Sequence, residues 1–329
     1  MVSIAYSDYR GKTQLCDTHT ATIVNYCKAR GKKYNILELE KEIKKYFSSV
    51  GIYTLESLVK ASPQKLRELK NHYDNLTAQE KETIVGKSTN IKKKKVRVRG
   101  KLNLITLYNY FIKKDDTLNS NYNSDVLAKE SDIFTCPYCN ENYTYHYQNS
   151  KGKLSRTFDW DHVYPKEKYP FLAISFFNLV PSCKVCNSLK SNNNSHFFNP
   201  HIDINVDDVY EYHINIDSPD FITNIRSIQF LLLFSRNNNK RQEFQDTFKA
   251  IHLRERITQH KNIIRDILRK KRIYNDLFLT SLDKQFNGLD FHEFNNEEIK
   301  SLLWGVEFNH EQYYKKPFSK LTSDILKDI

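Results

Sequence analysis

Four of the six cysteines form two short pairs whose spacing suits a metal ion. Cys136 and Cys139 enclose two residues, and so do Cys183 and Cys186. This spacing lets both thiolates of a pair reach one tetrahedral ion at about 2.3 Å. Two such pairs complete a closed four-cysteine site of the structural kind, for which Zn²⁺ is the natural ion in a reducing compartment. The sequence therefore predicts a structural zinc site.

The segment between the two pairs carries polar side chains of the types that hydrolytic sites use. It spans residues 140–182, which exceeds the usual zinc-ribbon spacing of about 15–20 residues. Within it, His162 offers a neutral imidazole that can accept a proton at working pH. Asp161 offers a hard oxygen ligand, and Asn187, directly after the second pair, offers a carbonyl oxygen. Few protein ligands leave room for waters and phosphate oxygens, which suits Mg²⁺ or Mn²⁺.

The order of these residues matches a known motif set. The elements are Asp161-His162 with Pro165, then Asn178-Leu179, then the second cysteine pair with Asn187 and Lys190. This set resembles the HNH endonucleases, the ββα-metal nucleases, whose members commonly carry Asp-His-x-x-Pro, Asn-Leu and Cys-x-x-Cys-Asn-x-x-Lys. The similarity covers roughly residues 134–200. Asn187 stands where many relatives have His, so the chain resembles an HNN variant, and Asn favours Mg²⁺ or Mn²⁺ over a catalytic zinc.

The resemblance implies a role for each motif residue. His162 would be the general base, while Asp161 and Asn187 would hold the catalytic Mg²⁺ or Mn²⁺. Asn178 would cross-link the hairpin loop and orient His162. Consecutive strand residues point to opposite faces, so Asp161 and His162 can serve one site only if their strand ends or bulges there.

The excess of basic residues favours a polyanionic partner. The chain has 51 Lys and Arg against 39 Asp and Glu, a net charge of +12. Such a field raises the encounter rate with nucleic acids, although a lysine-rich proteome would produce the same excess. The candidates for phosphate contact are Lys92, Lys93, Lys94, Lys95, Arg97, Arg99 and Lys190. The alternatives are a solvated linker for the run from 92 to 99 and an ordinary solvated lysine at 190.

These residues must be positioned by an α+β fold in three regions. We expect a mainly helical N-terminal region with a basic linker over residues 1–124. The zinc-stabilised ββα-metal core follows over 125–205, as the resemblance implies. A strand pair and then a helical C-terminal region occupy 206–329.

Hydrophobic spacing predicts several elements within these regions. Residues 36–47 carry apolar side chains at helical spacing, and Ser62-Pro63 is typical of a helix start. Alternating residues from Val209 predict strands, with helix again from about residue 222. Ile257, Ile264 and Leu268 lie on one stripe of a long helix that is basic on its other faces, where Arg256 lies. Such a basic face is either solvated or follows a nucleic acid.

Composition excludes several classes of protein. With 329 residues, of which 39% are hydrophobic, the chain can bury a core, which excludes bulk disorder. The longest apolar runs fall far short of the roughly 18 residues of a membrane span, and the first residues lack an apolar signal segment. We therefore expect a cytoplasmic protein without a membrane partner.

Together these features predict metal-dependent hydrolysis of nucleic-acid phosphodiesters, with DNA favoured and RNA as an alternative substrate. Two competing functions remain open: a non-catalytic zinc protein that binds nucleic acid, and a scaffold subunit for a partner ATPase or sensor. Residues 314–324 are similar to the tails of bacterial HNH proteins encoded with anti-phage defence ATPases. This second resemblance implies a role in defence.

Overall fold

A computed structural model of the chain describes residues 1–4, 9–29, 35–91, 94–113, 122–190, 197–222, 224–287 and 296–327. Helices and two-stranded antiparallel sheets alternate along it, which confirms the predicted α+β class. Among the described residues, no helix combines the length and apolar character needed to cross a bilayer.

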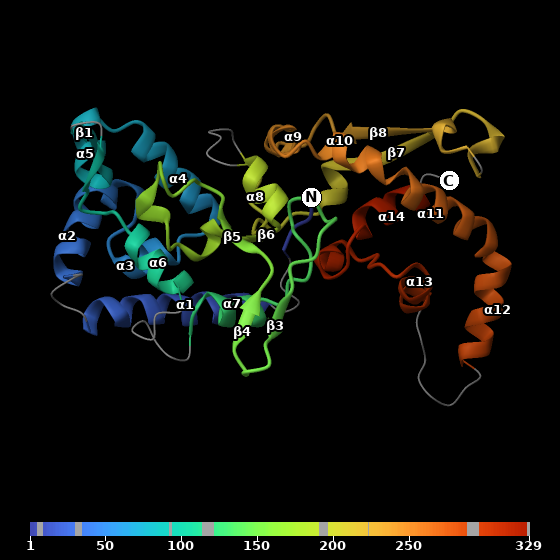
Figure 1. Cartoon of the computed structure of the whole chain (residues 1–329), viewed down its shortest axis with the longest axis horizontal. Helices are drawn as coiled ribbons and strands as arrows, with labels where there is room; N and C mark the ends of the chain where they lie inside the picture. The colour runs from blue at the N-terminus through green and yellow to red at the C-terminus, as the bar shows by residue number, and fades with distance from the viewer. Residues whose placement is uncertain are drawn as a thin grey trace.

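The N-terminal part is a helical lobe at one end of the molecule (Figure 1). Its elements are α1 (Tyr9–Ala29), α2 (Ile36–Phe47), α3 (Leu55–Val59), α4 (Pro63–Asp74), α5 (Ala78–Val85), the hairpin of β1 (Gly86–Ile91) and β2 (Lys94–Arg99), and α6 (Ile105–Lys113). A first hydrophobic core, built by residues between 15 and 179, lies within this lobe and extends to the middle of the molecule.

Local sequence signals account for the two helices that the pattern predicted here. The side chain of Asn35 accepts hydrogen bonds from two backbone amides in the first turn of α2. Ser62 caps α4 in the same way, and Pro63 occupies the first turn, where no amide donor is needed. Leu39 and Ile43 lie one turn apart on α2 and are buried, so the apolar stripe faces the core.

The central part contains α7 (Ser124–Glu130), β3 (His146–Gln148), β4 (Leu154–Arg156), β5 (Asp159–His162), β6 (Leu179–Ser182) and α8 (Lys184–Lys190). Strands β5 and β6 pair antiparallel, with Asp161 opposite Val180. Side chains of this hairpin enter two different cores, since Trp160 belongs to the first core and Val163 and Val180 to a second one. Figure 1 shows the hairpin between the two ends of the molecule, so it joins them.

The C-terminal part surrounds the second core together with residues 1–4. Its elements are β7 (Tyr210–Ile216), β8 (Ile228–Phe234), α9 (Arg241–Ala250), α10 (Leu253–Ile257), α11 (Lys261–Ile273), α12 (Asp276–Asn287), α13 (Asn296–Trp304) and α14 (Ser319–Lys327). The expectation of helix from about residue 222 was wrong, because β8 completes the strand pair first. The predicted long helix is also interrupted, since a 3₁₀ turn over residues 258–260 separates α10 from α11.

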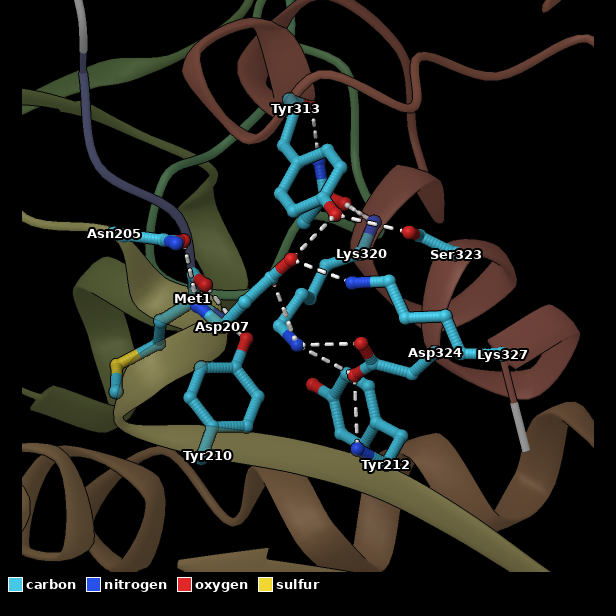
Figure 2. A network of polar contacts seen from close by, with 11 residues as sticks. Met1, Asn205, Asp207, Tyr210, Tyr212, Tyr313, Lys320, Ser323, Asp324 and Lys327 are labelled. Carbon is cyan, nitrogen blue, oxygen red and sulfur yellow. Dashed lines mark hydrogen bonds and ion pairs between the residues drawn. The ribbon is translucent and has the colours of Figure 1, made fainter. Parts of the chain in front are cut away.

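A buried cluster of charges fastens α14 to β7, as Figure 2 shows. Lys320 Nζ lies 2.6 Å from both carboxylate oxygens of Asp324 and 3.1 Å from Asp207 Oδ1. Asp324 also accepts a hydrogen bond of 2.9 Å from the backbone amide of Tyr212 in β7. The side chain of Lys320 is only 1% exposed, and a buried charge is tolerated when it is paired in this way. The cluster therefore fixes the C-terminal helix on the sheet.

Buried His19 makes the stability of the first core depend on pH. Its Nε2 donates to the carbonyl of Ile174 at 2.8 Å, and its Nδ1 accepts from the hydroxyl of Tyr122 at 3.2 Å. Burial lowers the pKa of His19 from 6.5 to about 4. The unfolded chain therefore binds a proton below pH 6.5 while the folded chain does not, so acid destabilises the fold.

We expect His19 alone to lower the free energy of unfolding by roughly 1.4 kcal/mol between pH 7.5 and pH 5.5. Urea denaturation at both pH values, on the natural chain and on His19→Gln, measures this contribution. The variant should lose that much less stability over the interval. An unchanged pH dependence in His19→Gln would contradict the assignment.

Candidate functional site

The four paired cysteines come together in one buried cluster, which we call the cysteine cluster. Cys183 and Cys186 lie where β6 passes into α8, and Cys136 and Cys139 lie on the loop after α7. Their Sγ atoms all lie within 4.8 Å of one another. Tetrahedral zinc–thiolate sites have S···S edges of about 3.8 Å, given a Zn–S distance of about 2.3 Å. The cluster therefore fits a metal ion such as zinc, and its closed four-sulfur set suits a structural site.

Hydrogen-bond donors surround the sulfur atoms. The side-chain amide of Asn142 lies 3.9 Å from Cys139 Sγ and 3.6 Å from Cys183 Sγ. The guanidinium of Arg256 lies 3.3 Å from Cys186 Sγ. Hydrogen bonds from the other thiols of the cluster lower the pKa of Cys183, whereas burial raises that of Cys136 and hydrogen bonds within the cluster raise that of Cys186. A bound metal would be needed to hold all four groups as thiolates.

Arg256 occupies a different environment from the one that the sequence pattern predicted. We expected it on a solvated or nucleic-acid-tracking face of a basic helix. Its side chain instead is 20% exposed and also pairs with the carboxylate of Glu141. Its positive charge offsets the net negative charge that four thiolates would place around a divalent ion.

A pocket of about 650 Å³ opens beside β5. It is lined by residues of α6, β4, β5, the following loop and α8, namely Tyr108, Ile112, Arg156, Asp159, Trp160, Asp161, His162, Pro165, Lys166, Glu167 and Asn187. Strand β5 pairs with β6 along one edge, and at its other edge the Trp160 carbonyl accepts a hydrogen bond of 3.1 Å from the Tyr108 hydroxyl. The pocket lies at the end of β5, where side chains from both faces of the strand line it.

His162 is the last residue of β5 and is held in one orientation. Its Nε2 lies 2.9 Å from the carbonyl oxygen of Ala173, so this nitrogen must carry the proton and donate. The ring packs edge-on against Tyr108, with 4.6 Å between centroids. Burial, with a further contribution from Lys166, lowers the pKa of His162 to about 3. The imidazole is therefore neutral, with Nδ1 as its acceptor.

Asp161 points to the opposite side of the strand, toward the second core. Its Oδ2 accepts from the hydroxyl of Tyr138 at 2.8 Å and lies 2.9 Å from Lys190 Nζ. Burial and this carboxylate raise the pKa of Tyr138, which therefore stays protonated and donates. Among the described residues, Asp161 Oδ1 has no hydrogen-bond partner, and it is the oxygen left for a ligand in the pocket.

Asn187 reaches the same pocket from α8. Its Nδ2 donates to Asp159 Oδ2 at 3.2 Å, which leaves the carbonyl oxygen of the amide for another interaction. Asp159 precedes Asp161 by two residues on β5 and therefore supports Asn187 from the strand. The pocket thus brings together three residues that the motif singled out: Asp161, His162 and Asn187.

Asn178 lies outside the pocket and ties the loop between β5 and β6 together. Its Oδ1 accepts from the amide of Tyr164 at 2.8 Å, and its Nδ2 donates to the carbonyls of Tyr164 and Leu172 at 3.2 and 2.9 Å. Because Ala173 follows Leu172 directly, these bonds also fix the carbonyl that holds His162. The contact between Asn178 and the imidazole is indirect.

Lys190 is buried, which corrects its expected place on the surface. Its side chain is fully buried, and its Nζ donates to the His162 carbonyl at 2.6 Å besides facing Asp161. The Phe197 ring lies 4.8 Å from the ammonium. Lys190 is one helical turn after Cys186, whose thiol must face the cysteine cluster, so the same helix face is buried. In this position Lys190 does not present a charge to phosphate.

The basic run was only partly described by the structure. Lys92 and Lys93 lie outside the described residues. Lys94, Lys95 and Arg97 belong to β2, and the Arg99 guanidinium donates to the Asn103 carbonyl at 2.7 Å. Their contact with phosphate stays a prediction.

Sequence reasoning missed Tyr138, although a signal was available. Tyr138 lies between the two cysteines of the first pair, so whatever fixes these cysteines also fixes the backbone position of Tyr138. Its hydroxyl is the direct contact between the cysteine cluster's loop and Asp161. The cluster and the pocket are therefore mechanically coupled.

Comparisons of this chain with protein-family models, curated proteins and solved structures find no match. The case for a function therefore rests on the residues and their geometry.

Substituting Cys136 by Ser should abolish metal binding by the cysteine cluster, because a hydroxyl is a poor ligand for a soft, closed site. We expect bound metal to fall from about one ion per chain to near zero by elemental analysis. Cys16→Ser is the matched control, since Cys16 is buried but lies outside the cluster. Equal metal content in Cys136→Ser and the natural chain would contradict the site.

Replacing Lys190 by Met should destabilise the fold by about 3–5 kcal/mol, because it leaves the Asp161 carboxylate buried without its cation. Chemical denaturation measures the loss. Lys184→Met is the control on the same helix, where the side chain is exposed, and it should change stability by less than about 0.5 kcal/mol. Similar stabilities for the two variants would show that the Lys190–Asp161 pair is not buried as described.

Proposed function

We propose that the chain is a metal-dependent nuclease of the HNH type, which hydrolyses phosphodiester bonds of nucleic acid. The observation that carries the proposal is the convergence of Asp161, His162 and Asn187 on one open pocket. In this proposal β5, β6 and α8 form the ββα core that the resemblance implies, since they follow one another as strand, strand and helix.

His162 would act as the general base. The Ala173 carbonyl binds Nε2–H, so the lone pair that can take a proton is on Nδ1. A neutral imidazole held in one tautomer can accept a proton from a water that attacks phosphorus. A pKa of about 3 makes it a weak base in the free chain, and the negative charge of a phosphate bound in the pocket would raise that pKa toward the working pH. The hydrogen bonds of Asn178 support this geometry by holding the loop that carries Ala173.

Asp161 and Asn187 would hold the catalytic Mg²⁺ or Mn²⁺. Asp161 has one carboxylate oxygen bound by Tyr138 and Lys190, which leaves Oδ1 for a cation, and Asn187 offers its amide oxygen. Two oxygen donors on one side of a pocket fit a hard cation that keeps several waters. The ion would supply charge stabilisation to the phosphate that is being cleaved.

The cysteine cluster would hold a structural Zn²⁺ that positions the catalytic groups. Its first pair carries Tyr138, which binds Asp161, and its second pair starts the helix that carries Asn187 and Lys190. A bound zinc would therefore fix both ends of the pocket. We place it outside the chemistry, because four sulfur ligands leave no open position.

DNA is the favoured substrate, with RNA as the alternative. The net charge of +12 supports a polyanionic partner, and the run from Lys92 to Arg99 is the candidate for contacts to the phosphate backbone. The weaker similarity of residues 314–324 extends the proposal to a role in bacterial defence, with a partner ATPase or sensor.

Cleavage of supercoiled plasmid by the purified full-length chain tests the proposal. Cutting should require Mg²⁺ or Mn²⁺, and His162→Ala should reduce its rate by about 10²–10⁴-fold, as expected for loss of a general base. His213→Ala is the control, because His213 lies on β7 outside the pocket.

Equal cutting by His162→Ala and the natural chain would contradict the proposal. Metal-independent binding of DNA that no pocket substitution affects, without cutting, would favour a non-catalytic nucleic-acid-binding protein instead. Salt-dependent affinity is expected under both functions, so the dependence on His162 is the deciding observation.

A further inference from the structure

The hairpin of β3 and β4, together with the chain that leads into β3, carries a row of exposed tyrosines that the proposed chemistry does not use. Tyr143, Tyr145 and Tyr147 are 45%, 45% and 50% exposed. They alternate along an extended segment, so they lie on the same side of the chain. We call this surface the tyrosine face. Figure 1 shows the hairpin extending from the middle of the molecule, away from β5 and β6.

The rings of the tyrosine face are already arranged for stacking. The rings of Tyr143 and Tyr145 are nearly parallel, with 4.6 Å between centroids and 15° between planes. Each keeps about half of its surface in contact with solvent. Aromatic side chains usually bury this area in a core or at an interface. A preformed pair that stays exposed therefore presents a flat apolar surface to a partner.

The charge around the tyrosine face is positive. Between residues 142 and 157 the sequence contains no acidic residue, and it contains Lys151 and Lys153 at the turn. Both lysines are exposed. In the hairpin register Tyr147 pairs with Ser155, so Lys153 alternates onto the side of the tyrosines. The surface thus combines aromatic faces with cations and hydroxyl groups.

The opposite side of the hairpin is fastened to the fold and reaches the pocket. Arg156, on the other side of β4, pairs with the Asp125 carboxylate and donates to Ser124 at 2.7 Å. Arg156 and Asp159, which follows shortly after, also line the pocket. The hairpin is therefore held firmly beside the candidate active site.

We propose that the tyrosine face binds unpaired bases of the nucleic acid that the pocket cleaves. The inference rests on the proposed function for its choice of a nucleic acid as partner. Aromatic side chains next to cations are the pattern by which proteins hold single strands, because every base has a stacking face and every linkage carries a charge. Paired bases inside a duplex offer no such faces to the side of the helix.

The substrate class follows from this geometry. Single-stranded nucleic acid, or a duplex with a locally unpaired segment, would stack bases on the tyrosines. Because the tyrosines and Arg156 lie on opposite sides of the hairpin, the backbone would pass around the hairpin to reach the pocket. Lys151 and Lys153 would bind phosphates along that path. The chain would therefore bind a single strand more tightly than a duplex of the same length.

Fluorescence anisotropy with a fluorescein-labelled oligothymidine tests this inference. The full-length chain carries His162→Ala in every sample, which prevents cleavage while binding is measured. We expect Tyr145→Leu to weaken affinity by about 10-fold, since it keeps apolar volume but removes base stacking. Tyr145→Phe keeps the ring and should bind within about twofold of its parent. Lys153→Gln should reduce the steepness of log affinity against log salt by about 0.7, which is the contribution of one phosphate contact to a single strand.

Tyr53→Leu is the matched control, because Tyr53 is 51% exposed and precedes α3 in the N-terminal lobe. It should leave affinity unchanged. The inference is overturned if Tyr145→Leu binds as tightly as its parent, if the parent binds duplex more tightly than single strand, or if the parent binds no oligonucleotide. The last result would leave a protein partner as the occupant of the tyrosine face.

The two proposals fail separately. Metal-dependent cutting that needs His162, together with unchanged binding by Tyr145→Leu, would overturn only the role of the tyrosine face. Tyrosine-dependent binding by a chain that never cuts would overturn only the nuclease.

Discussion

The arrangement of the site depends on the buried carboxylate of Asp161. Removing a carboxylate from water is costly unless it is paired and hydrogen-bonded, and here Tyr138 and Lys190 meet both needs on one oxygen. Tyr138 comes from the first cysteine pair, and Lys190 comes from the helix that the second pair begins. The Asp161 carboxylate therefore connects three elements: it joins β5 to the cysteine cluster through the Tyr138 hydrogen bond and to α8 through the Lys190 ion pair. A metal in the cluster would strengthen that connection without touching a substrate.

The β5–β6 hairpin is the element on which two hydrophobic cores meet. Trp160 packs in the core of the N-terminal lobe, while Val163 and Val180 pack in the other. Alternation along the strand also sends His162 to Tyr108 and Asp161 to Tyr138. Each catalytic candidate is thus oriented by a different part of the chain. The N-terminal region is part of the pocket, because α6 supplies Tyr108 and Ile112 to its lining.

Much of the site could be predicted from spacing, and the remainder depended on long-range packing. Two-residue spacing located the cysteine cluster, and capping chemistry located α2 and α4, because these signals are local. The conflict between Asp161 and His162 on a strand is resolved by the end of β5, where both faces reach one pocket. The spacing of residues in the sequence could not show this, because it does not reveal which edge of β5 is left unpaired by β6.

The sequence predictions that were wrong for Lys190 and Arg256 have the same physical cause. Lys190 and Arg256 were assigned to surfaces because lysine and arginine are usually solvated, but both offset buried negative charge, at Asp161 and at the cysteine cluster. Strand β8 was missed since its pairing with β7 is a tertiary contact. Position relative to Cys186 would have identified the burial of Lys190, whereas nothing local marked Arg256.

The central claim is that Asp161 and Asn187 hold a catalytic cation separate from the cysteine cluster. The most direct measurement is the anomalous scattering of Mn²⁺ in crystals of the His162→Ala chain bound to an oligonucleotide. The account predicts a manganese peak beside Asp161 Oδ1 and the Asn187 amide oxygen, in contact with a phosphate, and a separate zinc peak among the four cysteines. A phosphate bound elsewhere, with no manganese in the pocket, would contradict it.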